Sequence, residues 1–567
     1  MGFLRSLQHN SYVEGVLTSL PVSLFSALIL TCIITRIVTG MRSTIAQNQV
    51  DSVSKTPNRI SYWIPWVGSA LSFARDIEGT IRNGRDASGD GIISYRIGSS
   101  TYYVVNMPSL VQQIFAQKSA TLSKQKVLEW FMKTAFDDKH ATRDEHAAFH
   151  SHHTALNLML KEDFINEATN KTARTVEREA ARLITSAPQT TLEGKPLEPW
   201  EEAGKVAFNA DGTFDANFYQ LIVHYMGQIV IDMLWGKALI QNYPNLQSDM
   251  WDFDEGVHHM LTPLAKITVN GRRAIACRTR LTEAMHAWHE AVATTQHGEV
   301  PAKKWGALDD ISQVMQDRVK VWVDSKASET LQKTNDVSVL WGVNVNSNKN
   351  VFWMLLQIYS RSELLSDIRE EIAPYVGVSP AGERGPDGFP KLDIDVDGLC
   401  KHCPLLKASF YETMRINMSG LGIRQVIKDV ALKESATDAS QFGKKRPQSY
   451  TIPAGTTLVL ANGTMQMDQR IFANPEEFMP ERFIEEGSDA RPKATMKNLH
   501  TFGGGLYKCK GRYFAEKEVL IFASSLLVMW DLAPTQGEEI AIPKMGYAGA
   551  SRSPLKDIRV RLARRYN

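Results

Sequence analysis

A glycine-rich stretch near the C-terminus, residues 502 to 515, constrains this chain more than any other part of the sequence. It reads Phe-Gly-Gly-Gly-Leu-Tyr-Lys-Cys-Lys-Gly-Arg-Tyr-Phe-Ala, and a helical run follows it to Met529. Glycines permit backbone angles closed to other residues and let a bulky group approach the main chain. Cys509 follows these glycines at the expected start of the helix, where free amides and the helix dipole favour a thiolate. A lone thiolate beside three basic residues suits the axial ligand of a haem iron. The alternative is a buried cysteine in an ordinary loop-to-helix turn.

The spacing within this stretch resembles the haem-binding signature of the cytochrome P-450 monooxygenases. The matching positions hold Phe502, Gly505, Cys509, Gly511 and Ala515. The resemblance implies that Cys509 is the axial ligand of the iron of haem b, and that Phe502, Gly505 and Gly511 belong to the cofactor site. One position departs from the family, because Tyr507 stands where a basic residue usually contacts a haem propionate. This departure weakens one expected contact and leaves the iron ligand unchanged.

Two further motifs follow the family order and imply a structural triad. The first is Glu-x-x-Arg, formed by Glu412 and Arg415 within a helix predicted over residues 403–416. Residues three apart share one helix face, although such pairs are common on solvated helices. The second, from Asn474 to Phe483, resembles the family's Phe-x-Pro-x-Arg-Phe motif and supplies Arg482. A buried acid between two guanidinium groups can be satisfied by bidentate bonds. In the family this triad fixes the loop that carries the haem.

Between these motifs, residues 424–430 predict a strand, and Arg424 stands where the family commonly contacts a haem propionate. Residues 336–360 resemble the long helix that crosses the oxygen-binding face of the haem. There Ser347 takes the place of the family's alcohol, and Asn346 takes the place of an acid. These two residues are the catalytic candidates. Cleavage of dioxygen needs protons, and an amide cannot supply a proton as an acid does. The reaction type is therefore in question.

The surroundings of Asn346 suggest a subgroup of the family. With Leu-Trp before it and Phe-Trp after it, this region resembles the subgroup that holds sterol 7α-hydroxylases and prostacyclin synthase. The chain is also similar to fungal members of specialised, or secondary, metabolism. The subgroup includes oxygenases and an isomerase, so the fold is implied more firmly than the reaction.

The N-terminal part contains an uncharged apolar run from Gly15 to Thr35. A membrane-spanning helix needs about 20 such residues. More cations follow this run than precede it, which places the rest of the chain on the cytoplasmic side. A cleaved signal peptide is the alternative, but its apolar core would be only about 7–15 residues long. We expect a tail (1–14), a transmembrane anchor (15–36), a linker with a proline-containing hinge (37–68) and a haem-thiolate catalytic domain (69–567).

Composition excludes several classes of function. A formal charge of +2 gives no general attraction to nucleic acid. Five cysteines, an odd number, argue against a disulfide framework. We interpret Cys400 and Cys403, a lone C-x-x-C, as incidental reduced thiols. Helical spacing would place His146, His150 and His153 on one face, where zinc is conceivable, but no acid or cysteine completes a site. A solvated face or a propionate contact is the preferred interpretation.

Hydrophobic periodicity gives the remaining elements. It predicts a hairpin over residues 91–105 with its turn at 98–100, and helices over 218–234, 274–293 and 362–376. Residues 377–390 and 435–449 are rich in polar residues or in glycine and proline, and we expect them to form surface loops.

The predicted fold class is mainly α with small β-sheets, a cytochrome P-450 fold preceded by one N-terminal transmembrane helix. The resemblance implies a monooxygenase that inserts one oxygen atom from O2 into a lipophilic substrate, such as a sterol, a terpenoid, a fatty-acid-like molecule or another specialised metabolite. Its electrons would come from NADPH through NADPH–cytochrome P-450 reductase, with cytochrome b5 as a further partner, at the endoplasmic reticulum membrane. Two alternatives stay open: an isomerase or dehydratase that acts without external oxygen, and a non-catalytic, membrane-tethered haem binder.

Overall fold

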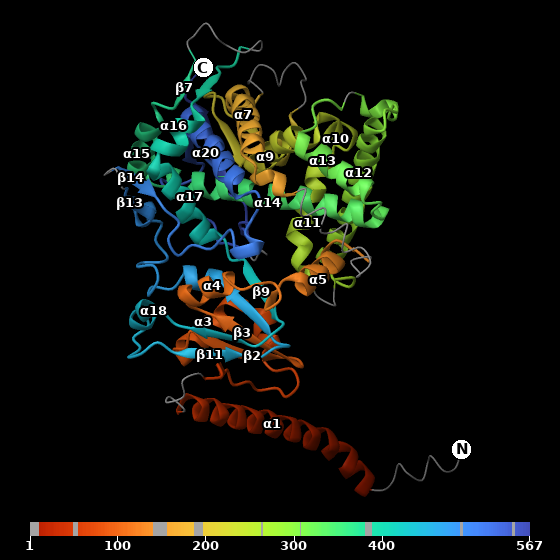
Figure 1. The fold of residues 1–567 in the computed structure, drawn as a ribbon, viewed down its shortest axis with the longest axis vertical. Coiled ribbons are helices and arrows are strands. Elements are labelled where there is room, and N and C mark those ends of the chain that lie inside the picture. Colours follow the sequence, from red (N-terminus) through yellow and green to blue (C-terminus); the bar gives the residue numbers. More distant parts are fainter. Residues whose placement is uncertain are drawn as a thin grey trace, which may run out of the picture. The chain divides into compact units, whose positions relative to one another are not determined.

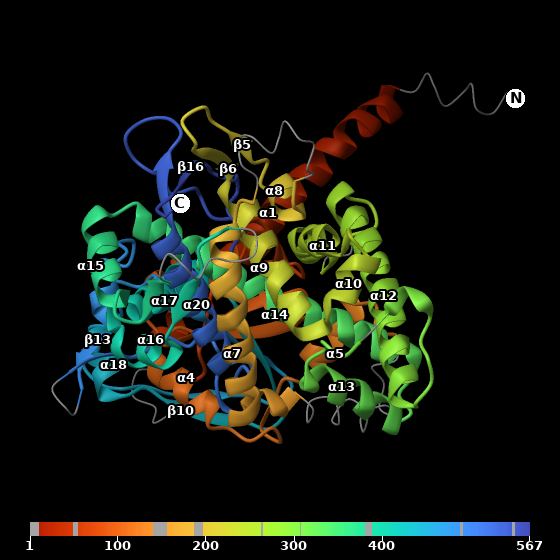
Figure 2. The same ribbon diagram turned by 90° about the horizontal axis from the view of Figure 1, so that it is seen from above.

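The structure, a computed structural model, describes residues 11–48, 55–139, 156–185, 197–261, 265–306, 308–379, 388–487, 491–546 and 550–566. The histidines at 146, 150 and 153 lie outside these ranges. The chain divides into two compact units. The first contains residues 1–127, 421–473 and 504–506, and the second contains 128–420, 474–503 and 507–567. Helices predominate and the sheets are small (Figures 1 and 2). This confirms the predicted fold class.

Two sheets organise the first unit. Their strands are β1 (Asn58–Arg59), β2 (Ile92–Ile97), β3 (Ser100–Val105), β4 (Leu122–Ser123), β9 (Leu421–Val426), β10 (Val430–Lys433), β11 (Ser449–Ile452) and β12 (Thr457–Ala461). The larger sheet has the order β1-β2-β3-β12-β9-β4, and the smaller sheet pairs β10 with β11. Strands β2 and β3 are the predicted hairpin, whose turn includes Gly98 with φ of 59°. In the larger sheet β12 runs parallel to β3 and antiparallel to β9.

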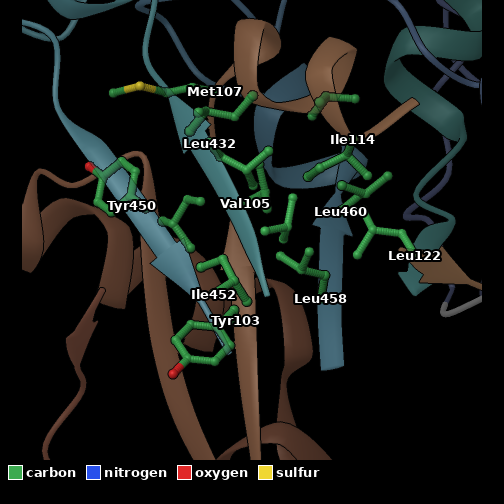
Figure 3. Close-up of a cluster of buried hydrophobic side chains, with 14 of the residues drawn as sticks. Tyr103, Val105, Met107, Ile114, Leu122, Leu432, Tyr450, Ile452, Leu458 and Leu460 are labelled. Carbon is green, nitrogen blue, oxygen red and sulfur yellow. The ribbon is translucent and has the colours of Figure 1, made fainter. Parts of the chain in front are cut away.

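Apolar side chains from both sheets and from helix α4 (Pro108–Phe115) form the core of this unit. Figure 3 shows Val105, Ile452, Leu458 and Leu460 pointing toward one another, with Ile114 of α4 among them. The other helices of this unit are α1 (Ser11–Asn48), α2 (Ala70–Arg75), α3 (Ile77–Ser88), α18 (Ala436–Gln441) and α19 (Asn462–Gln466).

Two sequence predictions in the first unit need correction. The strand predicted over 424–430 is two strands, because the chain turns at residues 427–429, where the Asp429 carboxylate accepts a hydrogen bond from the Ala454 amide at 2.7 Å. The surface loop predicted over 435–449 contains helix α18. The side chain of Ser435 caps this helix by accepting a hydrogen bond from the Asp438 amide, and Ala439 is buried beneath it.

Helix α1 contains the predicted anchor. Its residues Val22–Arg42 form a candidate membrane span of 21 residues with a mean hydropathy of 2.0, long enough to cross about 30 Å of hydrocarbon. The helix begins at Ser11 and continues to Asn48, past the expected boundary at residue 36, because no proline interrupts it there. Pro21 lies inside this helix.

Arg36 of α1 is tied to the segment that follows the helix. Its Nη1 donates to the Ser61 carbonyl oxygen at 2.6 Å and also contacts the Ser61 hydroxyl. Its guanidinium lies over the Trp63 ring, 5.6 Å from the ring centroid. The Thr39 hydroxyl lies 3.3 Å from both the amide and the carbonyl oxygen of Tyr62. These contacts join the second half of α1 to residues 61–63.

The long helix α14 (Glu329–Tyr359) is the centre of the second unit. It packs against α9 (Phe218–Trp235), α12 (Val269–Gln296), α17 (Pro404–Asn417) and α20 (Arg512–Met529). The predicted helix over 336–360 is thus confirmed, but it starts seven residues earlier, because the Ser328 side chain caps it by accepting a hydrogen bond from the Leu331 amide. The predicted helices over 218–234 and 274–293 are confirmed as α9 and α12. Figure 2 shows α7 (Glu162–Glu179) beside α20.

The remaining elements surround this centre. The helices are α5 (Gln125–Ala135, at the boundary of the units), η3 (Asn157–Leu160), η4 (Ala180–Arg182), α8 (Pro199–Ala203), α10 (Lys237–Asn242), α11 (Leu246–Met260), η5 (Lys303–Trp305), α13 (Gln313–Asp324), α15 (Ser362–Ile372), α16 (Val396–His402) and η6 (Pro480–Phe483). The strands are β5 (Ala207–Phe208), β6 (Phe214–Asn217), β7 (Val376–Val378), β8 (Leu392–Ile394), β13 (Ile484–Glu486), β14 (Pro492–Ala494), β15 (Trp530–Pro534) and β16 (Arg559–Arg564). Helix α15 ends four residues before the predicted limit, because the chain turns into β7, which also occupies the start of the loop predicted over 377–390.

A buried ionic cluster joins three helices of this unit. Asp336 of α14 accepts a hydrogen bond from Arg318 of α13 at 2.8 Å and lies 2.8 Å from Nδ1 of His289 on α12. All three side chains are almost fully buried. Because a buried carboxylate is tolerated only with such partners, the cluster fixes how the first half of α14 meets its neighbours.

Candidate functional site

The cysteine loop is a tight turn that depends on left-handed glycines. Gly503 and Gly505 have φ angles of 69° and 60°, which residues with a side chain rarely adopt. A Cβ atom at residue 505 would also lie only 2.2 Å from the carbonyl oxygen of Phe115. The Cys509 amide donates to the carbonyl oxygen of Phe502 at 2.9 Å, so the two ends of the turn meet. The backbone itself therefore requires glycine at 505.

Cys509 stands at the end of this turn with an exposed side chain. Helix α20 begins at Arg512, three residues after Cys509, with Gly511 as its N-terminal cap residue. The Arg512 guanidinium donates to the Cys509 carbonyl oxygen at 2.8 Å and lies over the Tyr513 ring. Cys509 thus precedes the first residue of the helix by almost a full turn. Arg512 binds the carbonyl oxygen of Cys509 through its guanidinium group.

The available donors suit an iron that a porphyrin already holds. Within the ranges that the structure describes, no three His, Cys, Asp or Glu side chains gather closely enough to bind a metal ion. A zinc ion held by protein alone takes three or four such ligands, whereas a haem iron needs one axial thiolate from the protein. A single exposed thiol on a glycine turn meets that need, so the residues present fit haem.

The structure brings together Glu412, Arg415 and Arg482. The Glu412 carboxylate receives hydrogen bonds from Nε and Nη2 of Arg415 at 2.7 and 2.8 Å, and from Nε of Arg482 at 3.1 Å. The Met479 amide adds another bond at 2.9 Å. Glu412 and Arg415 are fully buried. Arg415 also donates to the carbonyl oxygen of Glu477 at 3.2 Å. These bonds fasten α17 to residues 477–482, the segment that precedes the cysteine loop along the chain.

Ser347 of α14 lies close to Glu518 of helix α20, near enough for its hydroxyl to favour the ionised form of the carboxyl group. Both side chains are buried. Burial raises the pKa of Glu518 from 4.5 to about 7, and the Ser347 hydroxyl partly opposes this rise. A carboxyl group with this pKa is about half protonated at pH 7, whereas an ordinary glutamate is ionised there.

Sequence reasoning did not single out Glu518. A signal for it was present, since Glu518 lies four residues after Phe514 and three and four residues before Ile521 and Phe522. That spacing places the acid on the apolar face of the helix. An acid on such a face is either paired or functional.

Asn346, the other catalytic candidate, faces a different neighbour. Its side-chain oxygen accepts a hydrogen bond from the Ser551 amide at 3.4 Å, and its carbonyl oxygen accepts one from the side chain of Asn350 at 2.9 Å. Asn346 also lines a cavity in the second unit. Successive residues of a helix point about 100° apart, so Asn346 and Ser347 serve two different sides of α14.

Arg424 belongs to the first unit, on β9. Its side chain is almost fully buried, and its Nη1 donates to the carbonyl oxygen of Ile423 at 2.9 Å. Its expected contact with a haem propionate stays a prediction, as do the haem contacts of Phe502, Gly505 and Gly511.

We expect Glu412→Gln to lower the free energy of unfolding by about 3–5 kcal/mol, because it leaves the buried Arg415 guanidinium without a counter-charge. Glu481→Gln is the matched control, since Glu481 is an exposed acid in the same η6 segment, and it should change stability by less than about 0.5 kcal/mol. Urea unfolding of both variants checks this. Similar losses in the two variants would contradict the role of the buried triad.

A second prediction concerns pH. Glu518 binds its proton more tightly in the folded protein than in the unfolded chain, so its contribution to stability falls as the pH rises from 4.5 to about 7. Glu518→Gln removes this dependence. The stability of the variant relative to the wild type should therefore increase across this window, by on the order of 3 kcal/mol. Unfolding measured at several pH values tests this, and parallel pH profiles for the two proteins would refute it.

Comparison with known proteins agrees with this geometry. The family model described as Cytochrome P450 matches residues 283–557. Cytochrome P450 monooxygenase poxD of Penicillium oxalicum is 21% identical over 84% of this chain and 87% of its own. Cytochrome P450 7B1 of Mus musculus is 23% identical over 84% of this chain and 85% of its own. The 24-hydroxycholesterol 7-alpha-hydroxylase of Homo sapiens is 21% identical over 87% of this chain and 90% of its own. Residues 283–557, which contain α14, the Glu412 triad and Cys509, therefore belong to the cytochrome P450 family of haem-containing monooxygenases.

Proposed function

We propose that the protein inserts one oxygen atom from O2 into a lipophilic substrate, with electrons that a flavoprotein reductase transfers from NADPH. The observation that carries this proposal is the exposed thiol of Cys509 on its glycine turn, directly before α20. A haem iron bound by this thiolate supplies the activation of dioxygen for insertion into a C–H bond.

The protein's own acid–base groups support the oxygenase reaction. Monooxygenation consumes protons, and Asn346 in place of an acid cannot provide them. Glu518 is a buried acid whose pKa is raised to about 7, so it still carries a proton in a substantial fraction of molecules at neutral pH, and it lies close to the Ser347 hydroxyl. We assign the storage of a proton to Glu518 and its onward transfer to Ser347. Asn346 does not transfer a proton in this scheme. Its side chain is held by the Ser551 amide and keeps this part of α14 in place against residue 551.

The relatives support the substrate class, and helix α1 supports the location. The names of the relatives include a hydroxylase of 24-hydroxycholesterol and several fungal monooxygenases, which favour a sterol, a terpenoid or another specialised metabolite. The apolar helix α1 supports a single-pass anchor in the endoplasmic reticulum membrane, with the catalytic domain in the cytoplasm. In that setting NADPH–cytochrome P-450 reductase, with or without cytochrome b5, is the electron donor.

A second function is favoured by Asn346 alone. An isomerase or dehydratase that rearranges an already activated substrate, such as a peroxide, needs neither external electrons nor a supply of protons. An amide at position 346 is compatible with that chemistry.

The first experiment is the absorption spectrum of the dithionite-reduced protein with carbon monoxide. The wild type should give the red-shifted band of a thiolate-bound haem, and Cys509→Ala should lose it. Cys400→Ala, which removes a thiol outside the proposed site, is the control and should keep the band. No haem, or a histidine-type band that survives in Cys509→Ala, would overturn the proposal.

The second experiment separates the two reactions. Turnover of an accepted substrate should require both NADPH and the reductase, and Glu518→Gln should lower product formed per NADPH by about 100-fold, the low end of the usual range for a lost general acid. Glu481→Gln should leave this ratio unchanged. Product formation from a peroxide substrate without NADPH, unaffected by Glu518→Gln, would instead establish the isomerase.

A further inference from the structure

Gly504, in the middle of the cysteine turn, lies against the ring of Phe115, the last residue of helix α4. Residues 504–506 belong to the first unit, as α4 does. A Cβ atom at residue 504 would come closer than 3.0 Å to three atoms of this ring, a separation that real Cβ atoms essentially never show. The Phe115 ring therefore fills the space that a side chain at residue 504 would need.

The φ angle at residue 504 does not account for its glycine. Gly503 and Gly505 have positive φ angles, whereas Gly504 does not, so its φ angle is open to residues with a side chain. At residue 505 a second requirement is added, because the carbonyl oxygen of Phe115 occupies the place of a Cβ atom. Of these glycines, therefore, Gly504 is the one whose missing side chain is explained by the Phe115 ring.

The core of the first unit holds the Phe115 ring in place. Leu110, Val111 and Ile114 of the same helix are almost fully buried in this core, and Figure 3 shows Ile114 among its apolar side chains. Phe115 itself is half-buried and packs against the same core. Because protein cores are densely packed, the ring cannot move away from Gly504 without disturbing its neighbours on α4.

Hydrogen bonds to β10 and α18 fasten α4 along its length. The Ser109 amide donates to the Asp438 carboxylate at 2.9 Å, and the Ser435 amide donates to the Ser109 hydroxyl at 3.1 Å. One turn later, the Gln113 side chain donates to the Lys433 carbonyl oxygen at 2.5 Å and accepts from the Lys433 amide at 3.0 Å. A shift of α4 along its axis would break these bonds, so Phe115 lies at the end of an anchored helix.

We propose that Phe115 is a positioning residue for the cysteine turn. Its ring packs on Gly504 and its carbonyl oxygen lies against Gly505, so these two glycines are held in one place relative to α4. Cys509 lies four residues further along the chain. Under the proposed function, on which this inference rests, Phe115 thus fixes the start of the short segment that ends in the axial thiolate.

The test is a double-mutant cycle on the full-length holoprotein, read by the carbon monoxide spectrum of the reduced protein. Gly504→Ala should lose most of the red-shifted band, because the added methyl group overlaps the ring and displaces the turn. Phe115→Ala alone should lose part of the band, because the turn loses its support. The double variant has room for the methyl group, and it should recover the band at least to the level of Phe115→Ala.

Two controls isolate the ring. Phe442→Ala removes another half-buried phenyl ring that packs against the same core, and it should neither change the band alone nor restore it in Gly504→Ala. Gly505→Ala should lose the band and should not regain it in the Phe115→Ala background. At that position the added Cβ atom meets the backbone carbonyl oxygen of residue 115, and the φ of 60° is unfavourable for alanine.

Three outcomes would contradict the inference. They are an intact band in Gly504→Ala, a band that Phe115→Ala does not restore, and an equal restoration by Phe442→Ala. If Gly504→Ala yields no folded protein, the yield of folded double variant reports the same contact. Folding restored by Phe115→Ala supports the inference, and folding that is not restored refutes it.

Urea unfolding separates this inference from the proposed function, because the contact between residues 115 and 504 does not need haem. Gly504→Ala should lower the urea midpoint, and it should lower the midpoint less in the Phe115→Ala background. Coupled midpoints in proteins whose wild type lacks the thiolate band would refute the proposed function alone. A normal wild-type band, with no coupling between the two substitutions in the spectra or the midpoints, would refute the inference alone.

Discussion

The buried carboxylate of Glu412 is the interaction on which the rest of the site depends. A fully buried carboxylate is very costly unless its oxygens are occupied by donors. Here two guanidinium groups and the Met479 amide occupy them. Because one donor comes from the same helix and the others from residues 479–482, the carboxylate is satisfied only when α17 and that segment are in register. From this segment the chain continues through β13 and β14 to the cysteine turn. The hydrogen bonds of Glu412 therefore hold the start of the segment that leads to Cys509, although the two residues are about 100 positions apart in the sequence.

Helix α14 divides the chemistry between two of its faces. Ser347 turns toward the buried acid of α20, while its neighbour Asn346 turns toward Ser551 and the cavity. One step along the helix thus separates the side chain beside the buried carboxyl group of Glu518 from the side chain that lines the cavity. The helix can keep this division because the Asp336 cluster and its own apolar side chains fix its rotation. A rotation by one residue would move Ser347 away from Glu518 and Asn346 away from Ser551.

Features that depend on local spacing were predictable from the sequence. The glycine turn, the Glu412–Arg415 pair, the hairpin of β2 and β3, and the helices α9 and α12 follow from residues close together in the chain. Features that depend on distant partners were not. Glu518 could be placed on an apolar face, but its contact with Ser347 requires knowledge of which helix lies opposite. The polar cavity joins Asp254, Asn346 and Ser551, whose separations in the sequence carry no pattern. The break between β9 and β10 depends on a bond from Ala454 to Asp429, and residues 427–429 alone did not reveal it.

The contacts of Arg36 affect how the protein can be handled outside a membrane. Trp63 and Trp66 are 55% and 86% exposed even with α1 in place. A chain shortened to begin after Asn48 would lose the guanidinium that covers one face of Trp63 and the donor that satisfies the Ser61 carbonyl oxygen. Removal of the apolar helix, a common route to a soluble enzyme, would then leave an enlarged aromatic surface on the remaining protein. Such a shortened protein would still associate with detergent micelles or with itself, because part of the exposed apolar surface belongs to Trp63 and Trp66, which remain after the truncation.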